Sequence, residues 1–263
     1  MRNLRSYYSA SIAEFLRQSS SEIIGIIHSN DISAETTIQQ SNTWESEVQI
    51  LKEQLRSFSD GRIIFEYTIP RMGKRVDAVV LYKNIVFLLE FKCGDTEYRQ
   101  STYDQMYDYA LDLRNFQKES HNKLLVPIMV STRAAAVTNV IRERDRVIEP
   151  LRCNAYNIAD VINMVAARYN ESDFDCAEWE NSEYLPTPTI VEAAQAMKSG
   201  KNEFDIPLDR QQLADYLCVD RSAMSAQLCA LRDDGVLEFK KITLFCCDNP
   251  VLRHHCTINY PLK

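Results

Sequence analysis

Three residues in the middle of the chain have the types and the spacing of a metal-dependent hydrolytic site. Glu90 and Lys92 are two residues apart in a strongly apolar run, so on a strand both side chains leave the same face. A strand so apolar is expected to be central in its sheet, where unpaired charges would be strongly destabilising. Asp77 opens the preceding apolar run, and a tight turn at Lys83-Asn84 would place it opposite Glu90.

Opposed carboxylates repel each other, and a divalent cation is the simplest group that would hold Asp77 and Glu90 together. Mg²⁺, or Mn²⁺, bound there would polarise a phosphodiester and lower the pKa of an attacking water. Lys92 would then orient or deprotonate that water and offset charge in the transition state. The alternative is structural, with Asp77 and Glu90 in buried ion pairs with Arg75 and Lys92.

The elements that must position these residues predict an α/β domain with a mixed sheet flanked by helices. Residues 1–43 carry no motif that can be interpreted and form an N-terminal extension to this domain, which spans 44–185. Apolar spacing predicts the following elements: a helix at 44–58 capped by Thr43, strands at 62–69, 75–82 and 85–92, a helix at 98–118, strands at 124–130 and 147–153, and a helix at 157–169.

A long ordered block of residues resembles the PD-(D/E)XK nuclease-like segment at the front of a family of bacterial proteins that continue into a helicase-type ATPase. The resemblance covers about residues 44–195 and implies a restriction-endonuclease-like fold. It is carried by Phe65-Glu66-Tyr67, Ile69-Pro70-Arg71, Lys74-Arg75-Val76-Asp77-Ala78-Val79, Leu89-Glu90-Phe91-Lys92, Gln105, Tyr109-Ala110-Leu111-Asp112-Leu113, Asn115-Phe116 and Ser120-His121.

The resemblance also implies roles for individual residues. In that superfamily the residues that match Asp77 and Glu90 hold the metal, and the residue that matches Lys92 serves the nucleophilic water. Gln105 and Tyr109 resemble the Gln-x-x-x-Tyr element of RecB-type nucleases, which touches the nucleic acid near the metal. Glu47 matches the place of an accessory metal-binding carboxylate. The structural alternatives are a solvated helix position for Glu47 and simple helix packing for the Gln and Tyr pair.

The related proteins carry a nucleotide-binding loop downstream, and this chain departs from them there. Gly-Lys occurs only at Gly73-Lys74 and Gly200-Lys201, each without a glycine five positions earlier and without Ser or Thr after the lysine. We therefore expect no ATPase in this chain. A separate ATPase or helicase, and a second copy of the chain in a homodimer, are further partners that the resemblance leaves open.

The C-terminal part of the chain predicts a second, smaller module. Pro186 and Pro188 begin a linker at residues 186–205. Beyond the linker, two short helices are predicted at 208–217 and 221–232, and this close spacing is the geometry of a helix-turn-helix. Residues 236–245 would supply a two-stranded wing, so that 206–245 form a winged helix-turn-helix and 246–263 a tail.

This module resembles the DNA-binding domain of the Crp/Fnr transcription regulators. The runs that carry the resemblance are Leu213-Ala214-Asp215-Tyr216-Leu217, Val219-Asp220-Arg221-Ser222-Ala223-Met224-Ser225, Asp233-Asp234-Gly235 and Leu237-Glu238-Phe239. With Asp220 as the cap of the second helix, the expected DNA contacts are Arg210, Arg221, Ser222, Ser225, Lys240 and Lys241. Ala226 and Gln227 stand where the family often carries Arg and Glu, so no base specificity is implied. A winged helix that binds protein is the alternative.

Composition sets limits on these hypotheses. The chain of 263 residues is 45% hydrophobic, which is enough for a conventional core. Its net charge of −7 gives no long-range attraction for nucleic acid, so DNA contact would rest on a local basic patch or a bound metal. Its eight cysteines lack paired spacing and are expected to be reduced. Without a long apolar run or signal peptide, we expect a cytoplasmic protein that does not contact membranes.

The sequence thus favours a Mg²⁺- or Mn²⁺-dependent deoxyribonuclease that is tethered to DNA by a winged helix and acts in phage defence or DNA processing. The main alternative is a Crp/Fnr-like transcription regulator in which the nuclease fold is not catalytic. A third hypothesis is a nuclease that acts on RNA, or a domain retained for protein interaction.

Overall fold

The computed structural model of the protein describes residues 5–31, 38–69, 73–169, 171, 175–185, 203–205, 221–233, 237–240 and 243–246. The chain divides into two compact units, residues 1–185 and 186–263. Among the described residues, no helix is long and apolar enough to cross a membrane.

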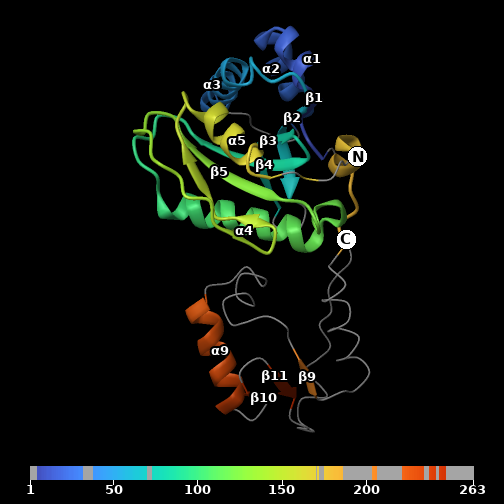
Figure 1. The fold of residues 1–263 in the computed structure, drawn as a ribbon, viewed down its shortest axis with the longest axis vertical. Helices are drawn as coiled ribbons and strands as arrows, with labels where there is room; N and C mark the ends of the chain where they lie inside the picture. The colour runs from blue at the N-terminus through green and yellow to red at the C-terminus, as the bar shows by residue number, and fades with distance from the viewer. Residues whose placement is uncertain are drawn as a thin grey trace. The chain divides into compact units, whose positions relative to one another are not determined.

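A mixed open sheet lies at the centre of the first unit (Figure 1). Its described strands run in the order β1-β2-β3-β4-β5-β7-β6, and β8 also pairs with β5. Neighbours from β1 to β4 are antiparallel, whereas β4 is parallel to β5. The prediction of a mixed α/β sheet is therefore confirmed. The strands are β1 Tyr8–Ser11, β2 Arg62–Ile69, β3 Lys74–Tyr82, β4 Ile85–Lys92, β5 Leu125–Ser131, β6 Glu143–Arg144, β7 Val147–Ile148 and β8 Leu151–Cys153.

Helices cover both faces of this sheet. One face packs against α4, which connects the parallel strands β4 and β5 as such a crossover requires. The other face packs against α1, α2, α3 and α5 (Figure 1). The helices are α1 Ile12–Arg17, α2 Ser20–Asn30, α3 Ile38–Gln54, α4 Gln100–Phe116, a short 3₁₀ helix Lys118–Ser120, α5 Ile158–Ala166 and α6 Cys176–Glu180.

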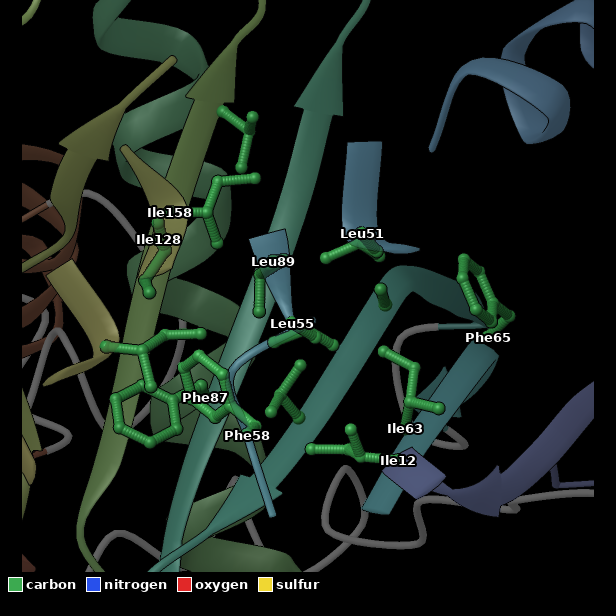
Figure 2. Close-up of a cluster of buried hydrophobic side chains, with 14 of the residues drawn as sticks. Ile12, Leu51, Leu55, Phe58, Ile63, Phe65, Phe87, Leu89, Ile128 and Ile158 are labelled. Carbon is green, nitrogen blue, oxygen red and sulfur yellow. The ribbon is translucent and has the colours of Figure 1, made fainter. Parts of the chain in front are cut away.

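The two faces of β4 contribute to two separate hydrophobic clusters, because successive side chains on a strand alternate. Phe87 and Leu89 pack with residues of α3 and α5 in the cluster of Figure 2. Val86 and Leu88 pack on the other side with residues of α4. Continued alternation therefore places Glu90 on the α4 face of the sheet.

The β3–β4 hairpin follows the predicted geometry. Its two-residue turn is Lys83-Asn84, and both residues have positive φ, 46° and 63°. A turn with two positive φ values matches the right-handed twist of the flanking strands. The predicted strands 62–69 and 85–92 are also confirmed, and the middle strand begins one residue earlier than predicted.

Several predicted boundaries were wrong. Helix α3 begins at Ile38 and ends at Gln54, so Thr43 lies within the helix and does not cap it. The strand predicted at 147–153 is two short strands, β7 and β8. The helix predicted at 157–169 is shorter and spans Ile158–Ala166. The N-terminal residues that had no interpretation provide β1, which pairs with β2, together with α1 and α2.

The described part of the second unit contains one helix and a small sheet. Helix α9 spans Arg221–Asp233, close to the predicted second helix. Strands β10 Leu237–Lys240 and β11 Thr243–Cys246 form an antiparallel hairpin where the wing is predicted, and β9 Glu203–Asp205 pairs with β11. The first predicted helix, 208–217, and Asp220 lie outside the described residues.

Candidate active site

Three carboxylate residues occupy one row across the neighbouring strands β2, β3 and β4. The β2–β3 ladder continues on both sides of Glu66 and Asp77 but skips this pair. The β3–β4 ladder ends at Ala78 and Leu89, one row before Asp77 and Glu90. The register is thus the predicted one, but Asp77 and Glu90 are not a paired row of the ladder. Backbone pairing is therefore interrupted at the carboxylate row between β2 and β3 and ends there between β3 and β4, whereas the pairing of β4 with β5 continues through Glu90 to Lys92.

The regular alternation of side chains between the two faces of the sheet is also broken at this row, on both β2 and β3. On β2, Ile64 and Tyr67 pack in the same cluster against α4 although they are three residues apart, and on β3 Val76 and Val79 do the same. A regular strand returns to one face only at even spacings. The irregularity on β2 coincides with Glu66, which has a φ of +55°. This left-handed conformation costs a residue other than glycine roughly 1–3 kcal/mol and is typical of functional sites.

Asp77 replaces part of the missing ladder with its side chain. Its Oδ2 accepts a hydrogen bond of 2.7 Å from the backbone amide of Phe91. Burial raises the pKa of Asp77 well above its usual range, and the negative charge of Glu90 raises it further, while the Phe91 amide opposes both effects. A nearby cation would therefore stabilise the negatively charged form of Asp77.

Glu90 accepts hydrogen bonds from both β4 and α4. Its side chain is almost completely buried, and its Oε1 accepts hydrogen bonds of 2.9 Å from both Lys92 Nζ and Gln105 Nε2. Desolvation lowers the pKa of Lys92, but the charge and hydrogen bond of Glu90 outweigh it, so that the net pKa is raised. Lys92 is thus a charged ammonium at the end of β4.

Gln105 and Tyr109 lie one turn apart on α4 and face the same carboxylate. Besides its bond to Glu90, Gln105 Nε2 donates to the hydroxyl oxygen of Tyr109 over 2.8 Å. Burial and the charge of Glu90 raise the pKa of Tyr109 to about 12, so this hydroxyl keeps its proton at neutral pH. The structure therefore brings Asp77, Glu90 and Lys92 of the strands together with the Gln and Tyr pair of α4.

Glu47 approaches the row from α3. Its side chain is 1% exposed, so the alternative of a solvated helix position is wrong. Burial raises the pKa of Glu47 well above its usual range, and the charges of Asp77, Glu66 and Glu90 raise it further. Three residues earlier on α3, Trp44 Nε1 donates to Glu66 Oε1 over 2.7 Å. This bond fixes α3 against β2 close to Glu47.

Glu66 belongs to this site, although the sequence interpretation did not select it. The available signal was a carboxylate within the apolar run of β2, similar to Glu90 within β4. The structural alternative predicted an ion pair for Asp77 with Arg75. Instead, Arg75 donates to the backbone carbonyl oxygen of Glu66 over 2.8 Å and packs over the Tyr7 ring. The predicted pair between Glu90 and Lys92 is present.

The carboxylates have one property that fits a divalent cation. Glu47 Oε2 and Glu90 Oε2 are buried without a hydrogen-bond partner, which is costly for a carboxylate oxygen. Within the part of the chain that is described, no group of three or more His, Cys, Asp or Glu side chains is placed to hold a metal. Two carboxylates with water completing the shell, as Mg²⁺ prefers, are therefore the arrangement that these residues could provide.

The second unit provides a separate candidate surface on α9 and the β10–β11 hairpin. A short helix followed by a two-stranded wing is the arrangement of a winged helix. Residues 189–254 match the Crp-like helix-turn-helix domain. This family match covers the described helix α9 and the hairpin. No curated protein and no solved structure matches the chain.

The predicted DNA contacts fall on this Crp-like domain. Arg221, Ser222 and Ser225 lie in the first half of α9, where Ser222 is exposed and Ser225 half-buried. Lys240 is the last residue of β10. Arg210 and Lys241 lie outside the described residues.

Proposed function

We propose that this protein binds DNA and cleaves phosphodiester bonds in a metal-dependent reaction at the Asp77, Glu90 and Lys92 site. The observation that carries the proposal is the hydrogen-bonded group around Glu90, in which Lys92 and Gln105 donate to one carboxylate oxygen while the other is buried without a partner. Charged groups placed together in this way at the end of a strand are typical of catalytic sites.

Each residue has a chemical task in this proposal. Asp77 and Glu90 would hold Mg²⁺ or Mn²⁺, with Glu47 as an accessory carboxylate. Such an ion would polarise the phosphodiester and lower the pKa of a bound water. Because the pKa of Lys92 is raised, its ammonium would act as a donor that orients water and offsets charge, not as the base. Gln105 and Tyr109 would position the substrate beside Glu90.

The Crp-like domain supports DNA as the substrate. The match to residues 189–254 is to a Crp-like helix-turn-helix domain, and helix α9 and the β10–β11 hairpin lie within the matched range. Bound to duplex DNA, this module would raise the local concentration of substrate for the first unit. The net charge of −7 makes such a tether useful, because the chain as a whole does not attract polyanions.

A second candidate function is transcription regulation by a Crp/Fnr-like protein with a non-catalytic first unit, and two observations are consistent with it. The Glu90–Lys92 pair already satisfies one carboxylate oxygen, and no three-carboxylate cluster is placed for a metal among the described residues. In that case the buried charged residues would contribute only to the stability of the first unit.

Cleavage assays with purified protein separate the two functions. We expect linear or circular DNA to be degraded in Mg²⁺ or Mn²⁺, and Asp77→Asn or Lys92→Ala to lower the rate by about 10²-fold or more. Asp60→Asn and Lys83→Ala are matched controls, because both lie away from the carboxylate row, and they should retain the wild-type rate. An RNA substrate of the same sequence tests the preference for DNA.

The outcomes are distinct. Equal cleavage by the wild-type protein and by both site variants would remove the nuclease proposal. Duplex binding without any cleavage would support the regulator instead. Faster cleavage of RNA than of DNA would change the substrate class while keeping the site.

A further inference from the structure

The two sides of the carboxylate row differ in the hydrogen-bond donors that they offer to an anion. On the α3 side, Glu47 and Glu66 add carboxylates, and the side chain of Glu47 is fully enclosed. On the α4 side, the amide of Gln105 and the hydroxyl of Tyr109 are hydrogen-bonded to each other, and Asp104 and Asp108 of α4 add negative charge. Carboxylates therefore lie on both sides, but the α4 side also offers uncharged donors beside the row, and a phosphodiester anion needs such donors.

Lys74 extends the donor side toward solvent. It is the exposed first residue of β3, and its Nζ lies 6.0 Å from the centroid of the Tyr109 ring. This is within the range of a cation–π contact, which holds the ammonium over the ring. Among the described residues, no ion pair joins Lys74 to a carboxylate.

The large groove on the α3 side is less suited to a polyanion. It has a volume of about 1270 Å³ and lies between α2 and α3 on one wall and the residues that follow β4 and β5 on the other. Its charged lining includes Glu45 and Glu53 as well as Arg133. The groove therefore offers no excess of positive charge. The ammonium groups of Lys74 and Lys92 lie next to Tyr109 and Glu90, on the side of the row that faces α4.

We propose that Lys74 binds a phosphate of the substrate strand and that the strand reaches the metal site over α4, passing Tyr109 and Gln105. This inference rests on the proposed nuclease function, for which it names the path of the substrate. Lys74 acts as a positioning residue, since it contacts a phosphate next to the reacting one and leaves the metal ligands unchanged. Its loss weakens substrate binding more than turnover.

Lys83 provides a matched control at the other end of β3. It is also a lysine whose Nζ lies over a tyrosine ring, 5.5 Å from the centroid of Tyr82. It follows the end of β3 that is remote from the carboxylate row. Lys74→Ala and Lys83→Ala therefore remove the same charge and the same type of contact, and only one of the two is next to the site.

The test uses the full chain and a labelled oligonucleotide at several salt concentrations. We expect Lys74→Ala to lower kcat/KM by about threefold to tenfold through KM, and to reduce the salt slope by about 0.7 to 0.9. Lys74→Arg should restore most of the loss. In the Asp77→Asn background without metal, fluorescence anisotropy should show the same weakening of binding by Lys74→Ala, and Lys83→Ala should match its parent in both assays.

The outcomes separate this inference from the function on which it rests. If the wild-type protein cleaves the oligonucleotide and Lys74→Ala behaves as Lys83→Ala does, the proposed substrate path is wrong, while the proposed nuclease function is retained. If Lys74→Ala lowers kcat with KM unchanged, a phosphate-binding role is also wrong. If the wild-type protein neither binds nor cleaves the oligonucleotide, both proposals fall.

Discussion

At the residue scale, Glu47 and Asp77 are carboxyl groups that fold into a site unfavourable to their charged forms. Burial and neighbouring carboxylates raise both pKa values well above the usual range. A group whose pKa is higher in the folded than in the unfolded state stabilises the fold fully below the unfolded pKa of about 4, and this contribution is lost as the pH rises through the folded pKa. Protons and a divalent cation thus compete for the same oxygens.

We predict that the metal-free protein becomes less stable as the pH rises from about 4 through the raised carboxyl pKa values, and that Mn²⁺ stabilises it more at pH 8 than at pH 5. Urea unfolding in EDTA and in MnCl₂ checks this. Both tryptophans of the chain, Trp44 and Trp179, lie in the first unit, so their fluorescence reports on it alone.

Asp77→Asn should flatten this pH dependence in EDTA and remove most of the stabilisation by Mn²⁺. Asp60→Asn, at an exposed position, should leave both unchanged. A Mn²⁺ effect that is equal at both pH values, or that survives Asp77→Asn, would show that the cation binds elsewhere.

The site residues differ in how far the sequence could predict them. Asp77, Glu90 and Lys92 could be selected because strand alternation and a two-residue turn fix which side chains meet. Their metal and catalytic roles stay predictions. Glu66 could not be selected on the same basis, since the positive φ at Glu66 breaks the alternation that such an argument assumes.

At the scale of elements, the N-terminal strand is joined to the end of the first unit by one buried carboxylate. Glu180, on α6, accepts hydrogen bonds from the hydroxyls of Ser6 and Ser9 over 2.7 and 2.6 Å and from Arg62 Nε over 3.2 Å. These partners come from β1, the residues before it, and β2. Loss of the carboxylate would leave several polar groups with no partner in a mostly buried position.

We predict that Glu180→Ala lowers the free energy of unfolding of the first unit by roughly 2–4 kcal/mol. Urea unfolding followed by tryptophan fluorescence measures it. Glu178→Ala is the control, because Glu178 is exposed on the same short helix, and it should change the stability by less than about 0.5 kcal/mol. Equal effects of the two substitutions would mean that the hydrogen bonds to Glu180 contribute nothing to stability.

The limits of a helix or strand could be predicted where a single pattern of apolar residues marks both of its ends. The strands β2 and β4 are buried along most of their length, and short breaks bound them, so their limits could be read directly. The start of α3 could not, because the residues between Ile38 and Trp44 are polar and carry no apolar stripe. Strand β1 is too short for a pattern and is defined by its pairing with β2.

At the scale of the whole molecule, two compact units share one chain, and the proposed function gives them different tasks. The proposed cleavage chemistry lies within residues 1–185, and the Crp-like domain within 189–254. If the Crp-like domain serves only to hold DNA, weakening it should reduce occupancy of the first unit by substrate without changing the chemical step. Affinity and turnover then report on different units.

We predict that Arg221→Ala combined with Lys240→Ala weakens duplex binding by the full chain and reduces its salt slope by about 2, because two phosphate contacts are lost. The cleavage rate at saturating DNA should stay within about twofold of wild type, while KM rises. Arg232→Ala is the matched control, since Arg232 is at the opposite end of α9 in an exposed ion pair with Asp233. A proportional fall of the saturated rate would show that the Crp-like domain takes part in turnover, and an unchanged salt slope would show that these two residues do not bind phosphate.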